Sequence, residues 1–184
     1  MFETSKIVFS PRVRKSPYFN STIKYGAKAF SVYNHMYMPA SYDGVVEDYT
    51  NLLNGVQLWD VGVERQVQIK GPDAEAFAQF LTPRDIKKCP IGQAMYTPLT
   101  DFKGNLINDP VMLRIAKDCY WFSVSDGDLL LWAQGIAAWY QLDVDVDEPD
   151  VSPLQVQGPN STKLMIKVFG DWINDITFYK FKEI

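Results

Sequence analysis

The 184-residue sequence is poor in the residue types that build metal centres and disulfide frameworks. It has two cysteines, Cys89 and Cys119, and one histidine, His35. The two cysteines lack the spacing of a zinc motif and imply no disulfide framework. The single histidine excludes a multi-histidine metal site within this chain, so we expect no metal. Within its aromatic surroundings His35 is more typical of a structural residue than of a catalytic one.

Long apolar runs and clustered cations are also missing. No run of about 18 apolar residues occurs, so no membrane span is predicted. The first six residues lack the basic-then-apolar pattern of a secretory signal. Lysines and arginines are scattered through a chain of net charge −4, which argues against a nucleic-acid partner. These absences predict a cytoplasmic protein without nucleic-acid or membrane partners, and they leave self-association open.

Aromatic residues are plentiful. They make up 14% of the chain, within a composition (47% hydrophobic, 22% charged) that is ordinary for a globular protein. Most aromatic side chains pack in cores, but Tyr and Trp also line pockets for flat or cationic ligands. The length suffices for one sizeable core or for one domain with part of another.

Hydrophobic periodicity predicts an α+β fold. Runs with apolar residues at helical spacing predict helices at 45–53, 74–81 and 129–137. Alternating or short apolar runs predict strands at 29–38, 56–70, 94–99, 119–125 and 143–147, with a final strand at 177–184 that we expect to be incomplete.

One pattern occurs twice. A β-like run, a Gly-Pro pair and a helix with an apolar stripe occur around Gly71-Pro72 and again around Gly158-Pro159. We therefore expect an internally duplicated domain, in which strand–turn–helix units form mixed or antiparallel sheets packed with helices.

The stretch 104–114 carries a polar pair, Asn108-Asp109, into the middle of an apolar run. A carboxylate in such surroundings is expected to be at least partly buried, which costs several kcal/mol unless a partner compensates it. Two interpretations remain open from the residues alone. Asp109 is either a strand-edge residue that caps a loop, or a carboxylate directed into a binding cleft.

Several motifs together resemble a known family. Leu58-Trp59-Asp60-Val61, Val67–Ala74, Gly92–Tyr96, Gly104–Asp109 and Val156–Pro159 follow one another as in the folate-binding module of the glycine-cleavage T protein (aminomethyltransferase) superfamily. Within it, the chain is more similar to the dimethylsulfoniopropionate (DMSP) demethylase branch, through the segments 11–17, 32–36, 59–65, 81–85 and 147–153.

The resemblance implies particular folate-binding residues. Asp109 matches the aspartate that faces the reactive nitrogens of tetrahydrofolate, which makes it the candidate catalytic residue. Tyr96, Ser125 and Tyr179 match other positions of the folate cleft, although family members carry Asn where this chain has Ser125.

Three further departures from the T-protein pattern are visible. Asn108 replaces the first aspartate of an Asp-Asp pair, and Phe178 replaces one tyrosine of a Tyr-Tyr pair. Gly62-Val63-Glu64 stands where T proteins have Ser-His-Met. The last difference disfavours an aminomethyltransferase and favours the demethylase branch.

The resemblance also implies a domain organisation. Residues 1–184 correspond to the N-terminal part of the folate-binding module. Within it, residues 1–55 form an entry segment and first helix, 56–150 a first repeat and 151–184 an incomplete second repeat. Family members continue into a second half and a small β-barrel domain, so we expect this chain to be the N-terminal half of a longer protein.

The implied reaction transfers a methyl group from the sulfonium of DMSP to N5 of tetrahydrofolate, giving 5-methyltetrahydrofolate and methylmercaptopropionate. Sulfur leaves as a neutral thioether, so the protein must chiefly align the reactants and exclude water. Tyr33 and Trp121 are candidate aromatic contacts for the sulfonium, worth about 0.5–2 kcal/mol each. Lys15 or Arg65 is the candidate partner of the substrate carboxylate.

Alternatives stay open at each of these points. Tyr33 and Trp121 are more typical of plain packing than of substrate contacts. A glycine-cleavage aminomethyltransferase would use the same Asp109, and a half-module of this kind can also serve as a non-catalytic folate-binding protein.

Overall fold

The computed structural model describes residues 8–184, which form two compact units. Unit 1 comprises the chain up to Val63 together with Ser152–Val168, and unit 2 comprises Glu64–Val151 and Phe169–Ile184. Each unit is described by itself below. The N-terminal hexapeptide, on which the targeting prediction rests, lies outside the described residues. Within residues 8–184, no helix is long and apolar enough to cross a membrane.

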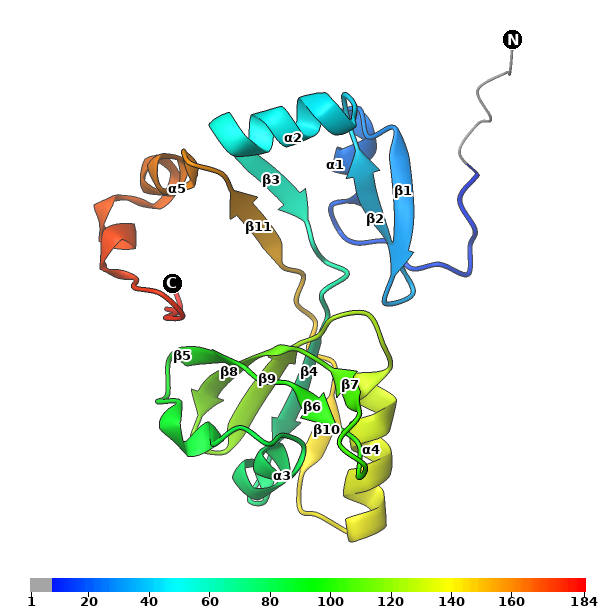
Figure 1. Ribbon diagram of the computed structural model, residues 1–184, viewed down its shortest axis with the longest axis vertical. Coiled ribbons are helices and arrows are strands. Elements are labelled where there is room, and N and C mark those ends of the chain that lie inside the picture. The colour runs from blue at the N-terminus through cyan, green and yellow to red at the C-terminus, as the bar shows by residue number, and fades with distance from the viewer. Residues whose placement is uncertain (1–7) are drawn as a thin grey trace. The chain divides into compact units, whose positions relative to one another are not determined.

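Unit 2 is built on a five-stranded antiparallel sheet in the order β10-β4-β9-β8-β5 (Figure 1). Its strands are β10 (Asp145–Asp147), β4 (Gln66–Lys70), β9 (Cys119–Ser123), β8 (Val111–Ala116) and β5 (Gln93–Tyr96). The helices α3 (Ala74–Phe80) and α4 (Leu129–Tyr140) pack on one face of the sheet and form the core with it. The strand β8, which lies within the stretch 104–114, pairs antiparallel with β9.

Strand alternation decides which face is buried. Val67 and Ile69 on β4 face the core together with Tyr120 and Phe122 on β9, and all four are at most 3% exposed. The intervening residues of both strands point to the opposite face. The apolar stripe predicted for α3 is buried as expected, because Ala74, Phe77 and Ala78 all belong to the core.

One charged cluster lies at the edge of this core. Nη2 of Arg114 is 2.7 Å from Oε2 of Glu75, and Nη1 donates to the carbonyl of Cys89 at 3.1 Å. The hydroxyl of Tyr120, which is fully buried, also reaches Oε2 of Glu75 at 3.2 Å. Burial raises the pKa of Tyr120 to about 12.

Two stretches of unit 2 that are continuous in the sequence pattern are divided in the structure. The run 94–99 is divided by Thr97-Pro98 into β5 and β6 (Leu99–Thr100), and the stretch 104–114 is divided at Asp109-Pro110 into β7 (Leu106–Asn108) and β8. A proline has no N–H to donate to a ladder, so each division falls at a proline. The short 3₁₀ helices are η1 (Ile86–Lys88) and η2 (Asp171–Asp175).

The predicted final strand at 177–184 is wrong. The segment makes a single bridge, between Lys180 and Gln93, rather than a ladder. Tyr179 has φ +59°, a left-handed conformation that no regular strand contains. Its carbonyl nevertheless accepts a hydrogen bond from the N–H of Ala94 at 2.7 Å, which attaches the segment to the edge of β5.

Unit 1 begins with α1 (Phe19–Lys24) and a hairpin of β1 (Ala29–Tyr33) and β2 (Met36–Ser41). The sequence predicted one strand over 29–38. The structure instead turns at Asn34-His35, where φ is +48° and +60°, the conformation of a two-residue hairpin turn. Asn34 is 2% exposed and donates to the carbonyl of Val63 at 2.9 Å, which fixes the turn against the following segment.

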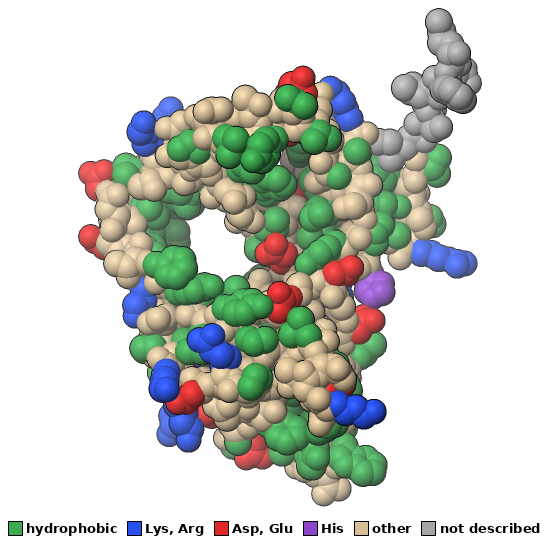
Figure 2. All heavy atoms as spheres, viewed as in Figure 1, with side chains coloured by type: hydrophobic (Ala, Val, Ile, Leu, Met, Phe, Trp, Pro, Cys, Tyr) green, Lys and Arg blue, Asp and Glu red, His purple; other side chains and the backbone are tan. Residues whose placement is uncertain are grey.

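The rest of unit 1 is α2 (Val45–Asn54), a two-stranded sheet of β3 (Gln57–Asp60) and β11 (Leu154–Gln157), and α5 (Ser161–Phe169). The predicted strand over 56–70 is two strands, β3 in unit 1 and β4 in unit 2. The bounds predicted for α2 are confirmed, but its apolar stripe is exposed: Val45 is 82% and Tyr49 60% exposed. Figure 2 shows hydrophobic side chains at the surface over this helix. Neither α2 nor α5 has a buried residue.

The two Gly-Pro pairs that the sequence repeats have matching close approaches in the two units. Gly71, after β4, has φ +142°, and a Cβ there would lie 2.5 Å from the carbonyl oxygen of Asp143, at the start of the segment leading from α4 to β10. Gly158, after β11, has φ +124°, and its Cβ would lie 2.5 Å from the carbonyl oxygen of Gly55, between α2 and β3. Each unit therefore repeats a helix, a strand, an antiparallel partner strand and a glycine turn into a second helix.

Candidate functional site

The site begins with Asp109, at the break between β7 and β8. The preceding stretch is apolar and the following residue is the buried Pro110, so the carboxyl group leaves the sheet where ladder pairing stops. Asp109 is half-buried. The hydroxyl of Ser125 donates to Oδ1 of Asp109 at 2.6 Å, and the hydroxyl of Tyr96 donates to Oδ2 at 3.3 Å. Each carboxylate oxygen thus receives one hydroxyl, which fixes the plane of the group.

Asn108 holds the serine in place. Its side chain is the buried member of the polar pair, at 3% exposure. Oδ1 of Asn108 accepts from the N–H of Ser125 at 3.1 Å, and Nδ2 donates to the carbonyl of Ser125 at 3.1 Å. Sequence reasoning noted Asn108 only as a polar neighbour and a departure from the family pattern. The missed signal was a second polar side chain in an apolar run, which needs a partner of its own.

The hydroxyl of Tyr96 donates to the carboxylate of Asp109, and the surroundings of Tyr96 keep this hydroxyl protonated. Desolvation raises the pKa of its hydroxyl, and the charge of Asp109 and the hydrogen bond to it raise that pKa further. Tyr96 is 42% exposed, so its ring also faces solvent beside the carboxylate. Around neutral pH the hydroxyl is therefore protonated and donates.

Tyr179 lies next to Tyr96. A smaller electrostatic contribution from Tyr179 also raises the pKa of the Tyr96 hydroxyl, and the carbonyl of Tyr179 is bonded to β5 as described above. Its ring contacts that of Phe178, with the centroids 4.3 Å apart. Unit 2 thus brings together all four predicted folate-binding residues, three of them through hydrogen bonds. Their role in binding folate stays a prediction.

The other candidates in unit 2 have structural partners. The indole N–H of Trp121 donates to Oε1 of Gln68 at 2.8 Å, on the face of the sheet opposite the core. The guanidinium of Arg65 forms an ion pair with Glu148, and both side chains are mostly buried. These contacts give each residue a packing or pairing role without testing a role in substrate binding.

The remaining candidates belong to unit 1. Nζ of Lys15 lies 4.8 Å from the ring centroid of Phe19 and 5.8 Å from that of Phe9, within cation–π range of both. Tyr33 ends β1, opposite Met36. His35 is exposed in the hairpin turn, and its carbonyl accepts from the N–H of Arg14 at 2.9 Å. Substrate binding by Lys15, Tyr33 and Trp121 stays a prediction.

The chemistry available at Asp109 is that of an oriented carboxylate. Two hydroxyl groups, those of Ser125 and Tyr96, donate to it. The buried amide of Asn108 in turn holds Ser125 in place. Such a group accepts hydrogen bonds from N–H groups of a ligand and can take up a proton from one of them. Within residues 8–184, no group of three or more acidic, His or Cys side chains is placed to hold a metal ion.

Comparison with known proteins identifies the family. The model of the GCVT N-terminal domain matches residues 18–184. The chain belongs to the GCVT N-terminal domain family. It is 44% identical over 175 residues to the dimethylsulfoniopropionate demethylase DmdA of Ruegeria pomeroyi, covering 95% of this chain and 48% of that protein. It is 25% identical over 173 residues to an aminomethyltransferase of Desulfitobacterium hafniense, of which it covers 47%.

A solved structure has the same fold. The aminomethyltransferase T of the glycine cleavage system from Bartonella henselae superposes with a TM-score of 0.80 at 21% identity, over 91% of this chain and 46% of that one. The α+β fold class predicted from the sequence is thereby confirmed. The chain spans about half the length of the relatives that it matches.

Proposed function

We propose that the chain contributes the carboxylate-bearing part of a tetrahydrofolate-dependent methyltransferase that takes its methyl group from DMSP. The observation that carries the proposal is the half-buried Asp109 carboxylate, fixed by hydrogen bonds from Ser125 and Tyr96. The 44% identity to a DMSP demethylase supports the choice of methyl donor.

In this reaction the carbon–sulfur bond of the sulfonium breaks as the bond from carbon to N5 of tetrahydrofolate forms. The electron pair of the broken bond stays on sulfur, and the proton of N5 is lost after transfer. Asp109 would accept a hydrogen bond from an N–H of the folate ring system and so set the direction of the N5 lone pair. Its two hydroxyl donors limit rotation of the carboxylate, so little orientation is lost when the ligand binds.

Gly62 favours the demethylase over an aminomethyltransferase. A Cβ at Gly62 would lie 3.0 Å from Cβ of Ser16 and 3.2 Å from Oδ1 of Asp60, both tighter than ordinary contacts. The Ser16 hydroxyl donates to Asp60, and Asp60 accepts from the N–H of Gly62 at 3.1 Å, so this corner is closely packed. The serine that T proteins carry here would require these residues to move.

Calorimetric titration of the chain with tetrahydrofolate, under anaerobic conditions, tests the proposal. Asp109→Asn should weaken binding by about 1.5–3 kcal/mol, because a hydrogen bond to a charged acceptor is lost. Asp118→Asn is the matched control: it removes the same charge from an exposed turn of unit 2 and should leave the affinity unchanged. Equal affinities for the two variants would place the folate contact elsewhere.

The choice of methyl donor needs a separate measurement. The chain should be incubated with tetrahydrofolate and DMSP, and formation of 5-methyltetrahydrofolate followed by chromatography. Folate binding without turnover of DMSP would support the non-catalytic alternative for this length of chain.

A further inference from the structure

The Asp109 carboxylate is bonded to hydroxyl groups and to no cation. Ser125 donates to Oδ1 at 2.6 Å and Tyr96 to Oδ2 at 3.3 Å. Within residues 8–184, no lysine or arginine forms an ion pair with Asp109. An ammonium or guanidinium group can only donate and so fits only an ionised carboxylate, whereas a hydroxyl can turn and accept. The partners of Asp109 therefore suit both its ionised and its protonated form.

The Ser125 hydroxyl has a second acceptor within reach. Its Oγ lies 3.1 Å from Oδ1 of Asn108, as well as 2.6 Å from Oδ1 of Asp109. A hydroxyl has one proton to donate, and its shorter bond to a charged oxygen is the stronger one. The proton therefore lies toward Asp109 while that residue is ionised. When Asp109 is protonated, it can donate to Oγ of Ser125, and the hydroxyl proton can turn to Asn108.

The Asn108 amide is fixed with its oxygen toward the serine. Its Nδ2 donates to the carbonyl of Ser125 and its Oδ1 accepts from the N–H of Ser125, both at 3.1 Å. Reversing the amide would break both bonds in a side chain that is 3% exposed. A carbonyl oxygen has two lone pairs, so Oδ1 can accept the hydroxyl in addition to the N–H.

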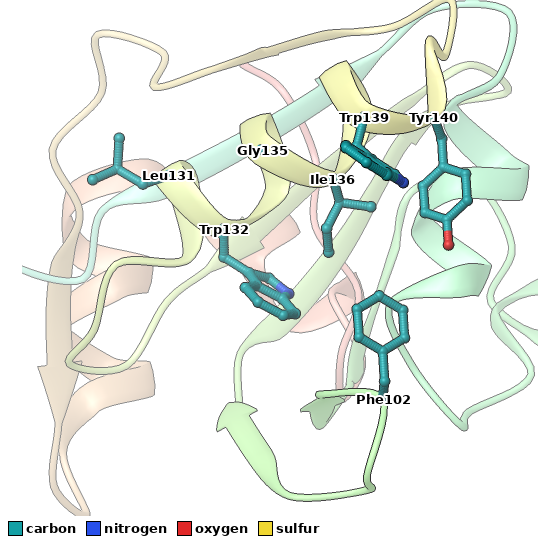
Figure 3. A pocket seen from close by; sticks show the side chains of 7 residues that line it. All are labelled: Phe102, Leu131, Trp132, Gly135, Ile136, Trp139 and Tyr140. Atoms are coloured by element: carbon teal, nitrogen blue, oxygen red, sulfur yellow. The ribbon is translucent and has the colours of Figure 1, made fainter.

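The segments that carry Asn108 and Ser125 are held together beyond these bonds. A Cβ at Gly127 would lie 3.3 Å from Nδ2 of Asn108, so the loop after Ser125 closely approaches the amide. Figure 3 shows Trp132 and Phe102 extending toward one another from α4 and from the turn before β7, with their ring centroids 6.1 Å apart. Packing of α4 against this turn helps to keep Ser125 beside the Asn108 segment.

We propose that Asp109, Ser125 and Asn108 together select the redox state of the folate ring. Ionised Asp109 accepts a hydrogen bond from a ring N–H of reduced folate. An oxidised ring binds only when Asp109 takes up a proton and the Ser125 hydroxyl turns from Asp109 to Asn108. This inference rests on the folate binding proposed above, and it names the form of folate that the site prefers.

The two forms of the ring differ in their hydrogen-bonding pattern. Tetrahydrofolate carries hydrogen on N5 and on N8, whereas folic acid has bare lone pairs at both nitrogens. A lone pair that faces an ionised carboxylate sets one acceptor against another and leaves both unsatisfied, which weakens binding. A proton that Asp109 takes from solvent turns this contact into a hydrogen bond, and no covalent bond of the ligand changes.

Two tyrosines are the titratable groups that face Asp109 from other strands and segments. Tyr96 of β5 is bonded to it, and Tyr179 lies next to Tyr96. Burial raises the pKa of Tyr96 and the charge of Asp109 raises it further, so Tyr96 stays neutral around neutral pH. Two acidic residues, Asp126 and Asp128, follow Ser125 in the chain. A variant of Asp109 separates its proton from theirs.

Calorimetric titration counts the protons, with folic acid and tetrahydrofolate each titrated anaerobically in two buffers of different ionisation enthalpy. Folic acid should bind with uptake of about one proton, so that its affinity falls about tenfold per pH unit from pH 6 to pH 8, and tetrahydrofolate with about none. Asp109→Asn should bind folic acid without uptake and tetrahydrofolate more weakly, because an amide donates without being protonated.

The outcomes separate this inference from the proposed function. If tetrahydrofolate binds but folic acid fails to bind at pH 6, binds without proton uptake, or keeps its uptake in Asp109→Asn, the inference is overturned and the proposed function stands. If tetrahydrofolate does not bind at all, both are overturned.

Matched variants test the Ser125 hydroxyl. Ser125→Ala should lower the affinity for tetrahydrofolate about tenfold and that for folic acid less, because the hydroxyl bonds the ionised carboxylate more strongly. Ser125→Thr keeps a hydroxyl and should retain both affinities. Ser123→Ala is the control, since the Ser123 hydroxyl accepts from Nε2 of Gln66 at 2.9 Å, and it should change neither affinity. Equal losses for the two ligands in Ser125→Ala would mean that the hydroxyl does not distinguish them.

Asn108 should give a spectroscopic signature of the turned hydroxyl. The carbon-13 resonance of its side-chain carbonyl should shift more when folic acid binds than when tetrahydrofolate binds, because only folic acid adds a hydrogen bond to Oδ1. In Ser125→Ala this difference should disappear. Equal shifts with the two ligands in the wild type would show that the hydroxyl does not turn to Asn108.

Discussion

Asn108 and Asp109 are neighbours in the sequence with opposite environments. Asn108 is almost fully buried and holds both the N–H and the carbonyl of Ser125 through its amide. Asp109 is half-buried and receives the Ser125 hydroxyl. Only an amide can both donate and accept in this way, since a carboxylate has no donor. The buried Asn108 therefore orients Ser125, and Ser125 orients the half-buried carboxylate of Asp109.

We expect Asn108→Asp to destabilise the fold by about 1–3 kcal/mol at neutral pH. The change removes the donor to the carbonyl of Ser125 and places a second negative charge beside Asp109. Burial should raise the pKa of the new carboxyl group, so the deficit should shrink in acid, where that group is protonated. Urea unfolding at neutral and acid pH measures both effects. Asn20→Asp, on the exposed side of α1, should cost little; similar losses in both variants would argue against the role of Asn108.

Tyr120 should make the stability of the chain depend on alkaline pH. Burial raises its pKa from 10.0 to about 12, so the folded state favours the neutral hydroxyl. The resulting stability is complete below pH 10 and is lost as the pH rises from 10 toward 12. We expect the loss to be about 1–3 kcal/mol over this range. Chemical unfolding of the wild type and of Tyr120→Phe gives the test, since the variant should show a shallower alkaline decline. Parallel declines would mean that other groups dominate.

At the scale of elements, the glycine turns decide how strands and helices join. Gly71 and Gly158 allow one backbone to approach another where any Cβ would overlap with a carbonyl oxygen. The same arrangement in both units explains why the Gly-Pro pairs could be recognised as a repeat from the sequence. Prolines and glycines determine backbone geometry locally, so their pattern can be interpreted from the sequence without knowledge of tertiary contacts.

Gly71→Ala should therefore cost more than Gly92→Ala. Both glycines belong to unit 2 and have positive φ, but a Cβ at Gly71 would lie 2.5 Å from the carbonyl oxygen of Asp143, whereas one at Gly92 meets nothing within 4 Å. We expect about 1–2 kcal/mol for Gly92→Ala, from the backbone conformation alone, and clearly more for Gly71→Ala. Thermal unfolding of the two variants provides the comparison. Equal losses would show that the backbone near Asp143 moves aside without cost.

Other elements could not be predicted in the same way. The turn at Asn34-His35 lacks the glycine that usually marks a two-residue hairpin, so the run 29–38 predicted a single strand. The final segment has strand-like residues but is turned by Tyr179, whose conformation is set by its attachment to β5. The candidate site was predictable as far as Asp109, because a carboxylate in an apolar run needs a partner. Its two hydroxyl donors, Tyr96 and Ser125, lie in other segments of the chain. Only the family resemblance indicated that these residues are close to Asp109.

At the scale of the whole molecule, the two units differ in their cores. The main buried cluster lies entirely in unit 2, whereas α2 and α5 of unit 1 bury no residue. We expect the amides of β4, β8 and β9 to be the most protected in hydrogen exchange, and those of α2 and α5 to exchange fastest among the helices, because few apolar contacts oppose their opening. Mass spectrometry of exchanged peptides measures this order. Protection of α2 equal to that of β9 would show that another surface covers the helix.

The close approaches at Gly71 and Gly158 join segments that are far apart in the sequence, and this affects the order in which the two units can fold during synthesis on the ribosome. Every strand of the five-stranded sheet has been made once Asp147 is added, so unit 2 can complete its core early. Unit 1 must wait, because β3 pairs with β11 and Gly55 meets Gly158, both of which come later in the chain. During that interval β3 has no partner strand, and an unpaired edge is where nascent chains associate wrongly. The strand β3 is thus made before unit 2 but finds its partner only after the five-stranded sheet of unit 2 is complete.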